Sequence, residues 1–298
     1  MSREPLTTEA RKDGEHLRRA EPSWGSFVPV FRDDGAAMAT SATNTIARLT
    51  LEVQPPVARI ALNNPPLNVI DLAMMAELVR ALGQVETRPD VSVVILNGQG
   101  KAFSAGVEVA AHTPDKGGEM LAQFHSVIRT LVASRKVTIA AVHGCCLGGG
   151  AELAMVCDMA YTDDAAQWGF PEIKLGCYPP VACTVLSALV GQKRAAELIL
   201  TGRSIAGREA AEIGLANRSM PAGELAGAVD QCVARLLKLS PRTLALTKEA
   251  LYAWDAVHFD KGLARAEKIY LQELMKTGDA QEGIQAFMEK REPKWTGK

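Results

Sequence analysis

The sequence predicts an α/β fold, because short apolar runs rich in β-branched residues alternate with longer amphipathic stretches. Residues 91–96 (Val-Ser-Val-Val-Ile-Leu) and 137–142 (Val-Thr-Ile-Ala-Ala-Val) are bounded by loop residues and predict buried strands. Residues 119–134 lie between them and repeat apolar side chains at helical spacing. A strand, a helix and a second strand in this order form a β-α-β unit, so we expect a mostly parallel sheet with right-handed crossovers.

The elements before this unit are predicted from the same periodicities. Residues 46–53 and 57–62 alternate apolar and polar side chains, which is typical of half-buried strands. Pro55-Pro56 between them predicts a hairpin-like turn, and a proline-rich loop covers residues 63–68. Residues 71–82 then predict a helix that begins near its first residue, an aspartate, because short acidic side chains commonly cap helix N-termini.

The last third of the chain changes to successive helical patterns with no strand between them. The predicted helices cover residues 193–200, 207–212, 222–238, 241–254 and 259–275. We therefore expect an α/β core over residues 45–240. Residues 241–298 should form a helical region that packs on this core or on a neighbouring subunit.

Residues 1–44 differ from the core in composition. Thirteen of the first 37 residues are charged and apolar periodicity is weak, so burial could hardly offset the entropy lost on ordering. Met38 then opens a segment that resembles a natural protein start. We expect residues 1–44 to form a charged, disordered extension. An overextended upstream start and a short amphipathic helix around residues 9–19 are the alternatives.

Composition disfavours several classes of protein. Apolar residues make up 47% and charged residues 22%, and the net charge of −1 gives little support to nucleic-acid binding. The six cysteines include no C-x-x-C pair and lie in apolar runs, which suits reduced, buried thiols rather than a zinc site. No apolar stretch approaches the ~20 residues of a membrane span, and the N-terminus lacks a signal-peptide core. We expect a cytoplasmic protein without a metal, nucleic-acid or membrane partner.

Three consecutive glycines mark the first candidate site. Residues 143–154 (His-Gly-Cys-Cys-Leu-Gly-Gly-Gly-Ala-Glu-Leu-Ala) run from a strand through these glycines into a helix that begins near Ala151. Glycines cost backbone entropy, but they let the backbone approach a ligand and present free N–H groups at a helix N-terminus. The turn predicts a site for an anion or a developing oxyanion. Phosphate binding stays an alternative, although neither the P-loop nor the dinucleotide fingerprint is present.

Two glutamates favour the oxyanion interpretation. Glu152 lies in the first helical turn after the glycines, and Glu172 follows a turn in Trp168-Gly-Phe-Pro-Glu; both have apolar neighbours. Helix N-terminal charge stabilisation would explain Glu152 alone, and a surface turn would explain Glu172 alone. Together they predict an acid–base pair whose pKa values are raised by desolvation.

With these motifs the chain resembles the crotonase (enoyl-CoA hydratase/isomerase) superfamily from about residue 45 to the C-terminus. The resemblance implies a crotonase-like ββα spiral core followed by helices that build a homotrimer or a dimer of trimers. It also implies an acyl-CoA substrate and no separate cofactor, because coenzyme A is part of the substrate. Since both glutamates are kept, the resemblance favours hydration or its reverse over isomerisation, dehalogenation or hydrolysis.

The same resemblance implies roles for individual residues. The oxyanion hole would be the backbone N–H groups of Val107 and Gly149, with Glu152 as the base and Glu172 as the acid. The residues implied to contact the substrate or its CoA moiety are Phe103, Ser104, Ala105, Gly106, Val109, Gly148, Phe170, Phe287 and Lys290.

Some residues of this chain differ from those usual in fatty-acyl-CoA hydratases, and these differences restrict the range of acyl groups that the resemblance implies. Fatty-acyl hydratases usually carry Gln where this chain has Phe170, although Phe170 could equally be a core residue. Residues 65–71, 103–113 and 171–180 instead resemble cyclohexa-1,5-diene-1-carbonyl-CoA hydratases. We expect a hydro-lyase for this cyclic dienoyl-CoA in aromatic-compound degradation. The alternatives are a short-chain β-oxidation enoyl-CoA hydratase and a non-catalytic relative that binds CoA or RNA.

Overall fold

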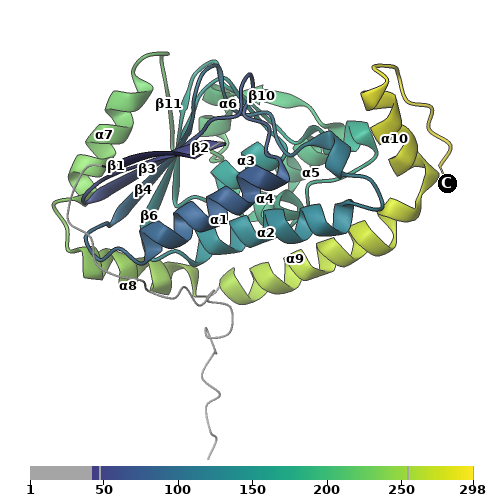
Figure 1. Ribbon diagram of the computed structural model, residues 1–298. Coiled ribbons are helices and arrows are strands. Elements are labelled where there is room, and N and C mark those ends of the chain that lie inside the picture. The colour runs from purple at the N-terminus through teal and green to yellow at the C-terminus, as the bar shows by residue number, and fades with distance from the viewer. Residues whose placement is uncertain (1–41, 47, 254, 298) are drawn as a thin grey trace, which may run out of the picture. The chain divides into compact units, whose positions relative to one another are not determined.

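Two β-sheets organise the chain (Figure 1). The computed structural model describes residues 42–46, 48–253 and 255–297, with side chains described for 48–253 and 258–297. The expectation of a disordered extension over residues 1–44 lies outside the described residues as far as residue 41, but residues 42–44 belong to strand β1, so the sheet begins before the expected core boundary at residue 45.

The larger sheet has the strand order β1-β2-β3-β4-β6-β8-β11. The first three strands form an antiparallel meander, and the remaining neighbours pair in parallel. Its strands are β1 Ala42–Ile46, β2 Leu49–Gln54, β3 Val57–Leu62, β4 Val93–Gly98, β6 Val137–Val142, β8 Met159–Asp163 and β11 Arg218–Met220.

The smaller sheet has the order β10-β9-β7-β5. β5, β7 and β9 pair in parallel, and β10 is antiparallel to β9. Its strands are β5 Ala102–Ser104, β7 Cys145–Leu147, β9 Gln167–Gly169 and β10 Ser204–Ala206.

Strand pairs that are consecutive in sequence are split between the two sheets. β4, β6 and β8 lie in the larger sheet, and the strand that follows each of them lies in the smaller one. Each pair is then followed by a helical segment, so a ββα unit occurs three times in succession. This confirms the expected ββα spiral core.

Helices follow the strands and dominate the C-terminal part. Helix α1 begins where predicted, since the Asp71 side chain accepts a hydrogen bond from the Met74 N–H (2.8 Å). The α-helices are α1 Leu72–Glu86, α2 Gly117–Ala133, α3 Gly149–Met155, α4 Pro180–Val190, α5 Gln192–Thr201, α6 Gly207–Glu212, α7 Leu225–Leu236, α8 Pro241–Tyr252, α9 Asp255–Gln272 and α10 Gly278–Met288. Three short 3₁₀ helices are η1 Val109–Ala111, η2 Pro171–Leu175 and η3 Leu274–Lys276.

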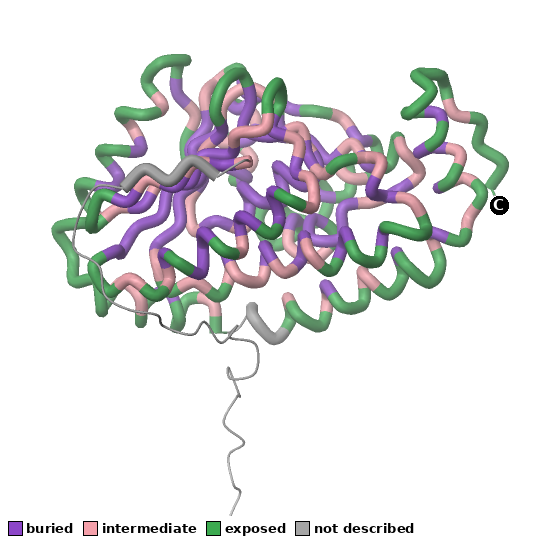
Figure 2. Tube along the Cα trace, viewed as in Figure 1, coloured by how far each residue is buried: buried purple, intermediate pink, exposed green. Residues whose placement is uncertain are grey.

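The central strands are buried on both faces (Figure 2). In β4, Val94 and Leu96 belong to the main core, to which α1 and α2 also contribute, whereas Val93 and Ile95 belong to a second core with Val229 of α7. Successive strand residues point to opposite faces, so a strand covered on both sides needs a continuous apolar run. That explains why the strands at 91–96 and 137–142 were recognisable from sequence.

Three expectations need correction. Residues 46–53 were predicted as one strand, but β1 ends at Ile46 and β2 begins at Leu49, and these two residues face each other across an antiparallel pair. The helices of the last third are interrupted by β10 and β11, each three residues long with a single buried side chain, too short to show alternation. The thiols are not all buried, because Cys183 is exposed.

No helix in the described part of the chain is long and apolar enough to cross a membrane. The same residues contain no group of three or more His, Cys, Asp or Glu side chains placed to hold a metal ion.

Candidate active site

The three glycines join strand β7 to helix α3. Gly148 adopts φ 52° and ψ −127°, a conformation that side-chain-bearing residues avoid. A Cβ atom on Gly148 would lie 2.6 Å from Oε1 of Glu172, and one on Gly149 would lie 2.6 Å from Cγ2 of Val107. The glycines are therefore needed because the acid and a neighbouring loop approach this turn closely.

The loop after strand β5 packs against the glycine turn. The Ile70 N–H donates to the Gly106 carbonyl (2.9 Å) and the Glu108 N–H donates to the Ile70 carbonyl (3.1 Å), which fixes the loop on both sides of Val107. A Cβ on Gly106 would lie 3.5 Å from the backbone nitrogen of Gly149. Among the described residues, the N–H groups of Val107 and Gly149 find no hydrogen-bond acceptor. Two free donors on adjoining segments are what an oxyanion hole requires.

Asn68 holds this loop in place. Its side chain is 1% exposed and its Nδ2 donates to the carbonyls of Ala102 (2.7 Å) and Phe103 (3.2 Å). The buried Ser104 hydroxyl donates to the Asn68 carbonyl (2.7 Å) and accepts from the Gly106 N–H (3.1 Å). Ser104, predicted as a substrate contact, therefore uses its hydroxyl to shape the loop.

Glu152 lies in the first turn of α3 and is 3% exposed. Its Oε1 accepts a hydrogen bond from the Ala182 N–H at the start of α4 (2.9 Å). Burial raises the pKa of Glu152 to about 7, although the backbone N–H groups of Ala182 and Val181 act in the opposite direction. Near neutral pH this carboxyl therefore exists in both ionised and protonated forms.

Glu172 lies in η2 and is 8% exposed. Its Oε2 is buried and has no hydrogen-bond partner within the described part of the chain. Burial raises the pKa of Glu172 well above its usual range, and the negative charge of Glu152 raises it further. Two adjacent buried carboxyls cannot both ionise easily, so Glu172 keeps its proton while Glu152 can lose one. The pair therefore contains an acid and a base at neutral pH.

Comparison with known proteins identifies the family. The family model "Enoyl-CoA hydratase/isomerase" matches residues 52–298. The chain belongs to this family. It is 35% identical over 257 residues to the cyclohexa-1,5-dienecarbonyl-CoA hydratase of Thauera aromatica, covering 86% of this chain and 98% of the relative. It is 37% identical over 257 residues to a "Probable enoyl-CoA hydratase" of Bacillus subtilis, covering 84% and 98%.

Solved structures agree with this family assignment. An enoyl-CoA hydratase from Mycobacterium avium subsp. paratuberculosis superposes with a TM-score of 0.76 at 28% identity, over 85% of this chain and 100% of that one. An enoyl-CoA hydratase from Geobacillus kaustophilus gives a TM-score of 0.65 at 33% identity, over 85% and 99%. The expectations of a crotonase-like fold and of an enoyl-CoA hydratase-type hydro-lyase are thereby confirmed.

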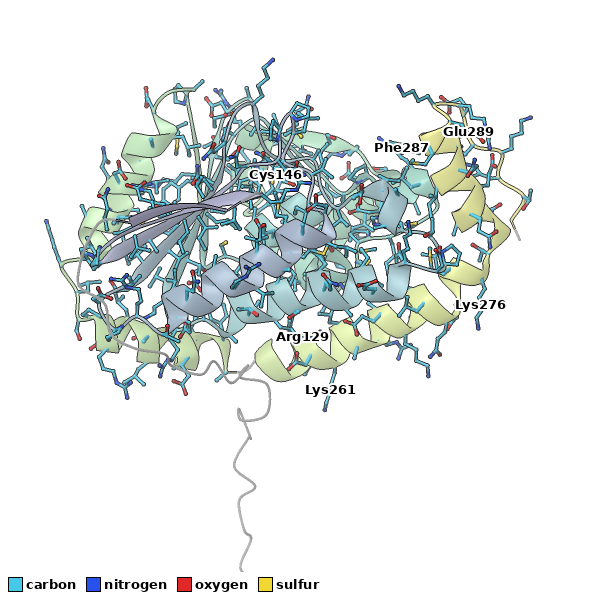
Figure 3. All side chains as sticks on the ribbon, in the orientation of Figure 1. Arg129, Cys146, Lys261, Lys276, Phe287 and Glu289 are labelled. Atoms are coloured by element: carbon cyan, nitrogen blue, oxygen red, sulfur yellow. The ribbon has the colours of Figure 1, made fainter. Side chains whose placement is uncertain are left out.

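The structure brings some of the other predicted site residues to this centre and not others. Ala105 and Gly106 belong to the loop after β5 that packs on the glycine turn, and Val109 begins η1 directly after this loop. Phe103 and Phe170 are fully buried core residues. Phe287 lies on α10 with 53% of its surface exposed (Figure 3), and Lys290 is an exposed residue just beyond that helix. No hydrogen bond or ion pair described in the structure joins Phe287 or Lys290 to Glu152 or Glu172, although α10 itself packs on η2.

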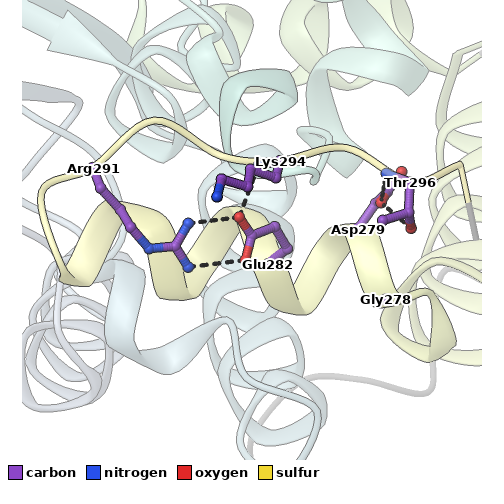
Figure 4. A pocket seen from close by; sticks show the side chains of 6 residues that line it. All are labelled: Gly278, Asp279, Glu282, Arg291, Lys294 and Thr296. Carbon is purple, nitrogen blue, oxygen red and sulfur yellow. Dashed lines mark hydrogen bonds and ion pairs between the residues drawn. The ribbon is translucent and has the colours of Figure 1, made fainter.

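A pocket with charged walls lies at the C-terminal end of the described residues. It is lined by Gly278, Asp279, Glu282, Arg291, Lys294 and Thr296 (Figure 4). Arg291 makes two hydrogen bonds to Glu282 (2.6 and 2.9 Å), and the Thr296 hydroxyl donates to Asp279 (2.9 Å). These pairs stabilise the C-terminal segment against α10.

Sequence reasoning missed Asn68 and Ala182. Asn68 was detectable in principle, because it lies in the proline-rich loop and asparagine side chains commonly bond the backbone of turns. Ala182 acts through its backbone, which no side-chain pattern reveals.

Proposed function

We propose that this enzyme adds water to the double bond of an enoyl-CoA thioester, with Glu152 and Glu172 as the acid–base pair. One observation carries the proposal: two neighbouring buried carboxyls with raised pKa values lie beside two unpaired backbone N–H groups. General acid–base catalysis needs groups that change protonation near the working pH. This pair meets that requirement.

In the proposed reaction the thioester carbonyl oxygen accepts hydrogen bonds from the N–H groups of Val107 and Gly149. Ionised Glu152 accepts a proton from water, and the water oxygen bonds to the β-carbon. Protonated Glu172 gives its proton to the α-carbon, which ends the enolate. The site is reset when Glu152 loses its new proton and Glu172 regains one. Coenzyme A enters as part of the substrate.

We propose a cyclic dienoyl-CoA as the preferred substrate. Support comes from the resemblance of three segments to cyclohexa-1,5-diene-1-carbonyl-CoA hydratases and from the Thauera aromatica relative of that name. Phe170, at the position where fatty-acyl hydratases usually carry Gln, is fully buried and lies two residues before Glu172 in the chain. The B. subtilis relative supports the competing assignment, a general enoyl-CoA hydratase.

Turnover of two thioesters separates the assignments. We expect kcat/KM for cyclohexa-1,5-diene-1-carbonyl-CoA to exceed that for crotonyl-CoA. Faster turnover of crotonyl-CoA would refute the cyclic substrate but leave hydration intact. Glu152→Gln and Glu172→Gln should each lower kcat by about 10²- to 10⁴-fold, while CoA thioester binding survives. Glu77→Gln is the matched control, because Glu77 is equally buried but accepts a hydrogen bond from the Arg48 N–H (2.9 Å). Unchanged turnover in both site variants would reject the mechanism.

We also propose that the enzyme acts in the cytoplasm as a homotrimer or a dimer of trimers. Exposed leucines on α8 and α9 support the assembly, with Leu246 47%, Leu251 67% and Leu271 37% exposed. If these side chains form one continuous apolar surface in the assembled protein, a subunit interface would cover it. Light scattering of the purified protein distinguishes monomer, trimer and hexamer.

A further inference from the structure

Phe124 packs against Gly149, the glycine that carries one of the two free N–H groups. It lies on α2, is 2% exposed and belongs to the main core. A Cβ atom on Gly149 would lie 3.1 Å from Cζ and 3.4 Å from Cε2 of the Phe124 ring. The tip of the ring therefore fills the space beside Gly149 in which any other residue would carry its side chain.

Val107, which carries the other free N–H group, borders the same space. Its Cγ2 atom would lie 2.6 Å from that Cβ on Gly149, and its side chain packs on the core cluster that contains Phe124. Its backbone is fixed by the bridge to Ile70. Gly149 thus lies against the side chain of the residue that carries the other donor and against one aromatic ring. In a close-packed interior, neither contact can loosen without opening a void.

The glycine turn has little internal support of its own. Helix α3 is seven residues long, begins at Gly149, and has Gly148 at its N-cap with no side-chain hydrogen bond. Glycines restrict the backbone least, so the direction of the Gly149 N–H depends on the groups packed around it. A developing oxyanion is stabilised best by donors that are already oriented toward it. The Gly149 donor therefore needs an external support, and Phe124 is in position to give it.

Helix α2 is itself anchored where it carries Phe124. The next residue, His125, is fully buried, and its Nδ1 lies 2.6 Å from Oε1 of Glu267 on α9. One turn later Arg129 donates to the same oxygen (3.0 Å). Hydrogen bonds that involve a charged group are the stronger ones, so rotation or sliding of α2 would break strong contacts. The Phe124 ring is thus held in place by its helix as well as by the core.

We propose that Phe124 is a positioning residue for the oxyanion hole: with Val107 it holds Gly149 so that the Gly149 N–H points at the thioester oxygen. This inference rests on the proposed hydration. Negative charge on that oxygen grows as water adds, so a misdirected donor weakens the transition state more than the bound substrate. Loss of the ring should therefore lower kcat and leave KM nearly unchanged.

The first test compares Phe124→Leu with Leu131→Ala. Leu131 lies on α2 about two turns after Phe124 and is 1% exposed, so both variants remove core packing from one helix. In Phe124→Leu, kcat should fall about 10- to 100-fold with little change in KM, because small misplacements of a catalytic group cost that much. Leu131→Ala should keep the wild-type kcat and KM, although urea should unfold it at a lower concentration. An unchanged kcat in Phe124→Leu, or equal losses of kcat in both variants, would overturn the proposal.

The carbonyl band of a bound thioester gives a readout that lost stability alone does not move. Butyryl-CoA with an isotope-labelled carbonyl has no double bond to hydrate, and hydrogen bonds to its carbonyl oxygen lower the infrared stretching frequency. In Phe124→Leu this frequency should rise toward that of free butyryl-CoA, whereas in Leu131→Ala it should equal that of the wild type. An unshifted band in Phe124→Leu overturns the proposal even where kcat falls.

A second substitution keeps the test decisive if Phe124→Leu does not fold. In Phe124→Met the side chain retains most of the apolar volume but loses the rigid ring. We expect kcat still to fall and the carbonyl frequency still to rise, each by a smaller amount. Wild-type values of both in Phe124→Met overturn the proposal for Phe124 while hydration stands. A wild-type enzyme that hydrates neither cyclohexa-1,5-diene-1-carbonyl-CoA nor crotonyl-CoA instead overturns the proposed function itself.

Discussion

Glu152 and Asp158 are six residues apart and both largely buried, yet the structure treats them in opposite ways. Asp158 pairs with the buried Lys248 ammonium (2.8 Å) and accepts hydrogen bonds from the N–H (2.7 Å) and hydroxyl (3.0 Å) of Thr138. Glu152 has one hydrogen bond to Ala182, and its charged neighbour is another carboxyl. Within the described residues, no ion pair includes Glu152 or Glu172.

The difference separates a structural carboxylate from a reactive one. A buried charge is tolerated when a cation and hydrogen bonds compensate for its lost hydration. Asp158 has that compensation and connects β6 to α8. Glu152 and Glu172 lack it, so their proton affinities rise into the range that acid–base chemistry uses. The uncompensated carboxyls of Glu152 and Glu172 are therefore expected to lower the stability of the folded protein. Asp158, in contrast, is stably buried only while the Lys248 cation is present.

Breaking the structural pair should give the largest effect on stability. Lys248→Met leaves the Asp158 charge buried without its cation, and we expect about 3–5 kcal/mol lower free energy of unfolding. Urea denaturation measures the change, and Lys261→Met, at an exposed position on α9, is the control. The double variant Asp158→Asn with Lys248→Met should recover part of the loss. If Lys248→Met changed the free energy of unfolding only slightly, the Asp158 carboxylate would not depend on its cation, and the contrast with Glu152 and Glu172 would be wrong.

Closing the space at the reactive site should affect catalysis more than stability. The added methyl of Gly149→Ala would meet Val107 at 2.6 Å and the Phe124 ring at 3.1 Å, which should displace one donor of the proposed oxyanion hole. We expect kcat to fall about 10²- to 10³-fold, as for loss of one such donor. Gly227→Ala is the matched control, since a Cβ there meets nothing within 4 Å and Gly227 lies in helix α7. Steady-state kinetics measure kcat for both variants. An equal loss of kcat in Gly149→Ala and Gly227→Ala would contradict the proposed role of the Gly149 N–H.

The smallest expected effect is a pH-dependent change in stability caused by the uncompensated carboxyl of Glu152. Folding raises the pKa of Glu152 from 4.5 to about 7, so the folded state binds the proton more tightly than the unfolded state. The stability that this proton provides is complete below pH about 4.5 and is lost as pH rises to about 7. The advantage of Glu152→Gln over wild type should therefore grow by about 1–3 kcal/mol across this interval. Denaturation of both proteins at several pH values measures this difference in unfolding free energy. A difference that stays constant with pH would contradict the raised pKa of Glu152. Wild-type kcat should fall as pH drops through about 7.

The sequence was sufficient for the parts of the site that depend on local chemistry. Continuous apolar runs predicted β4 and β6, and the glycines after β7 predicted the turn into α3. The two glutamates were found because charged residues in apolar surroundings are unusual. The pairing of Glu152 with Glu172 could be inferred only as a hypothesis, because it depends on how η2 folds back over α3.

Contacts between distant segments were beyond the sequence. The Asn68 bonds that shape the loop after β5 span more than thirty residues, and the bond from the Ala182 N–H to Glu152 joins α4 to α3 across thirty residues. The strands β10 and β11 were missed because pairing with neighbours, rather than their own composition, makes them strands. All of these features depend on tertiary contacts, and the spacing of apolar residues along the sequence carries no information about such contacts.

The packing of α10 against η2 determines when the site can form. A Cβ on Gly176, which follows η2, would lie 2.7 Å from the carbonyl oxygen of Asp279, and a Cβ on Gly283 of α10 would lie still closer to the carbonyl oxygen of Leu175 (2.3 Å), so neither position has room for a side chain. The backbone that carries the acid is thus supported by a helix more than a hundred residues further along the chain. Because domains fold as their residues emerge, the two sheets can form during synthesis before α10 is available. Glu172 then gains the support of α10 only once that helix has packed on η2.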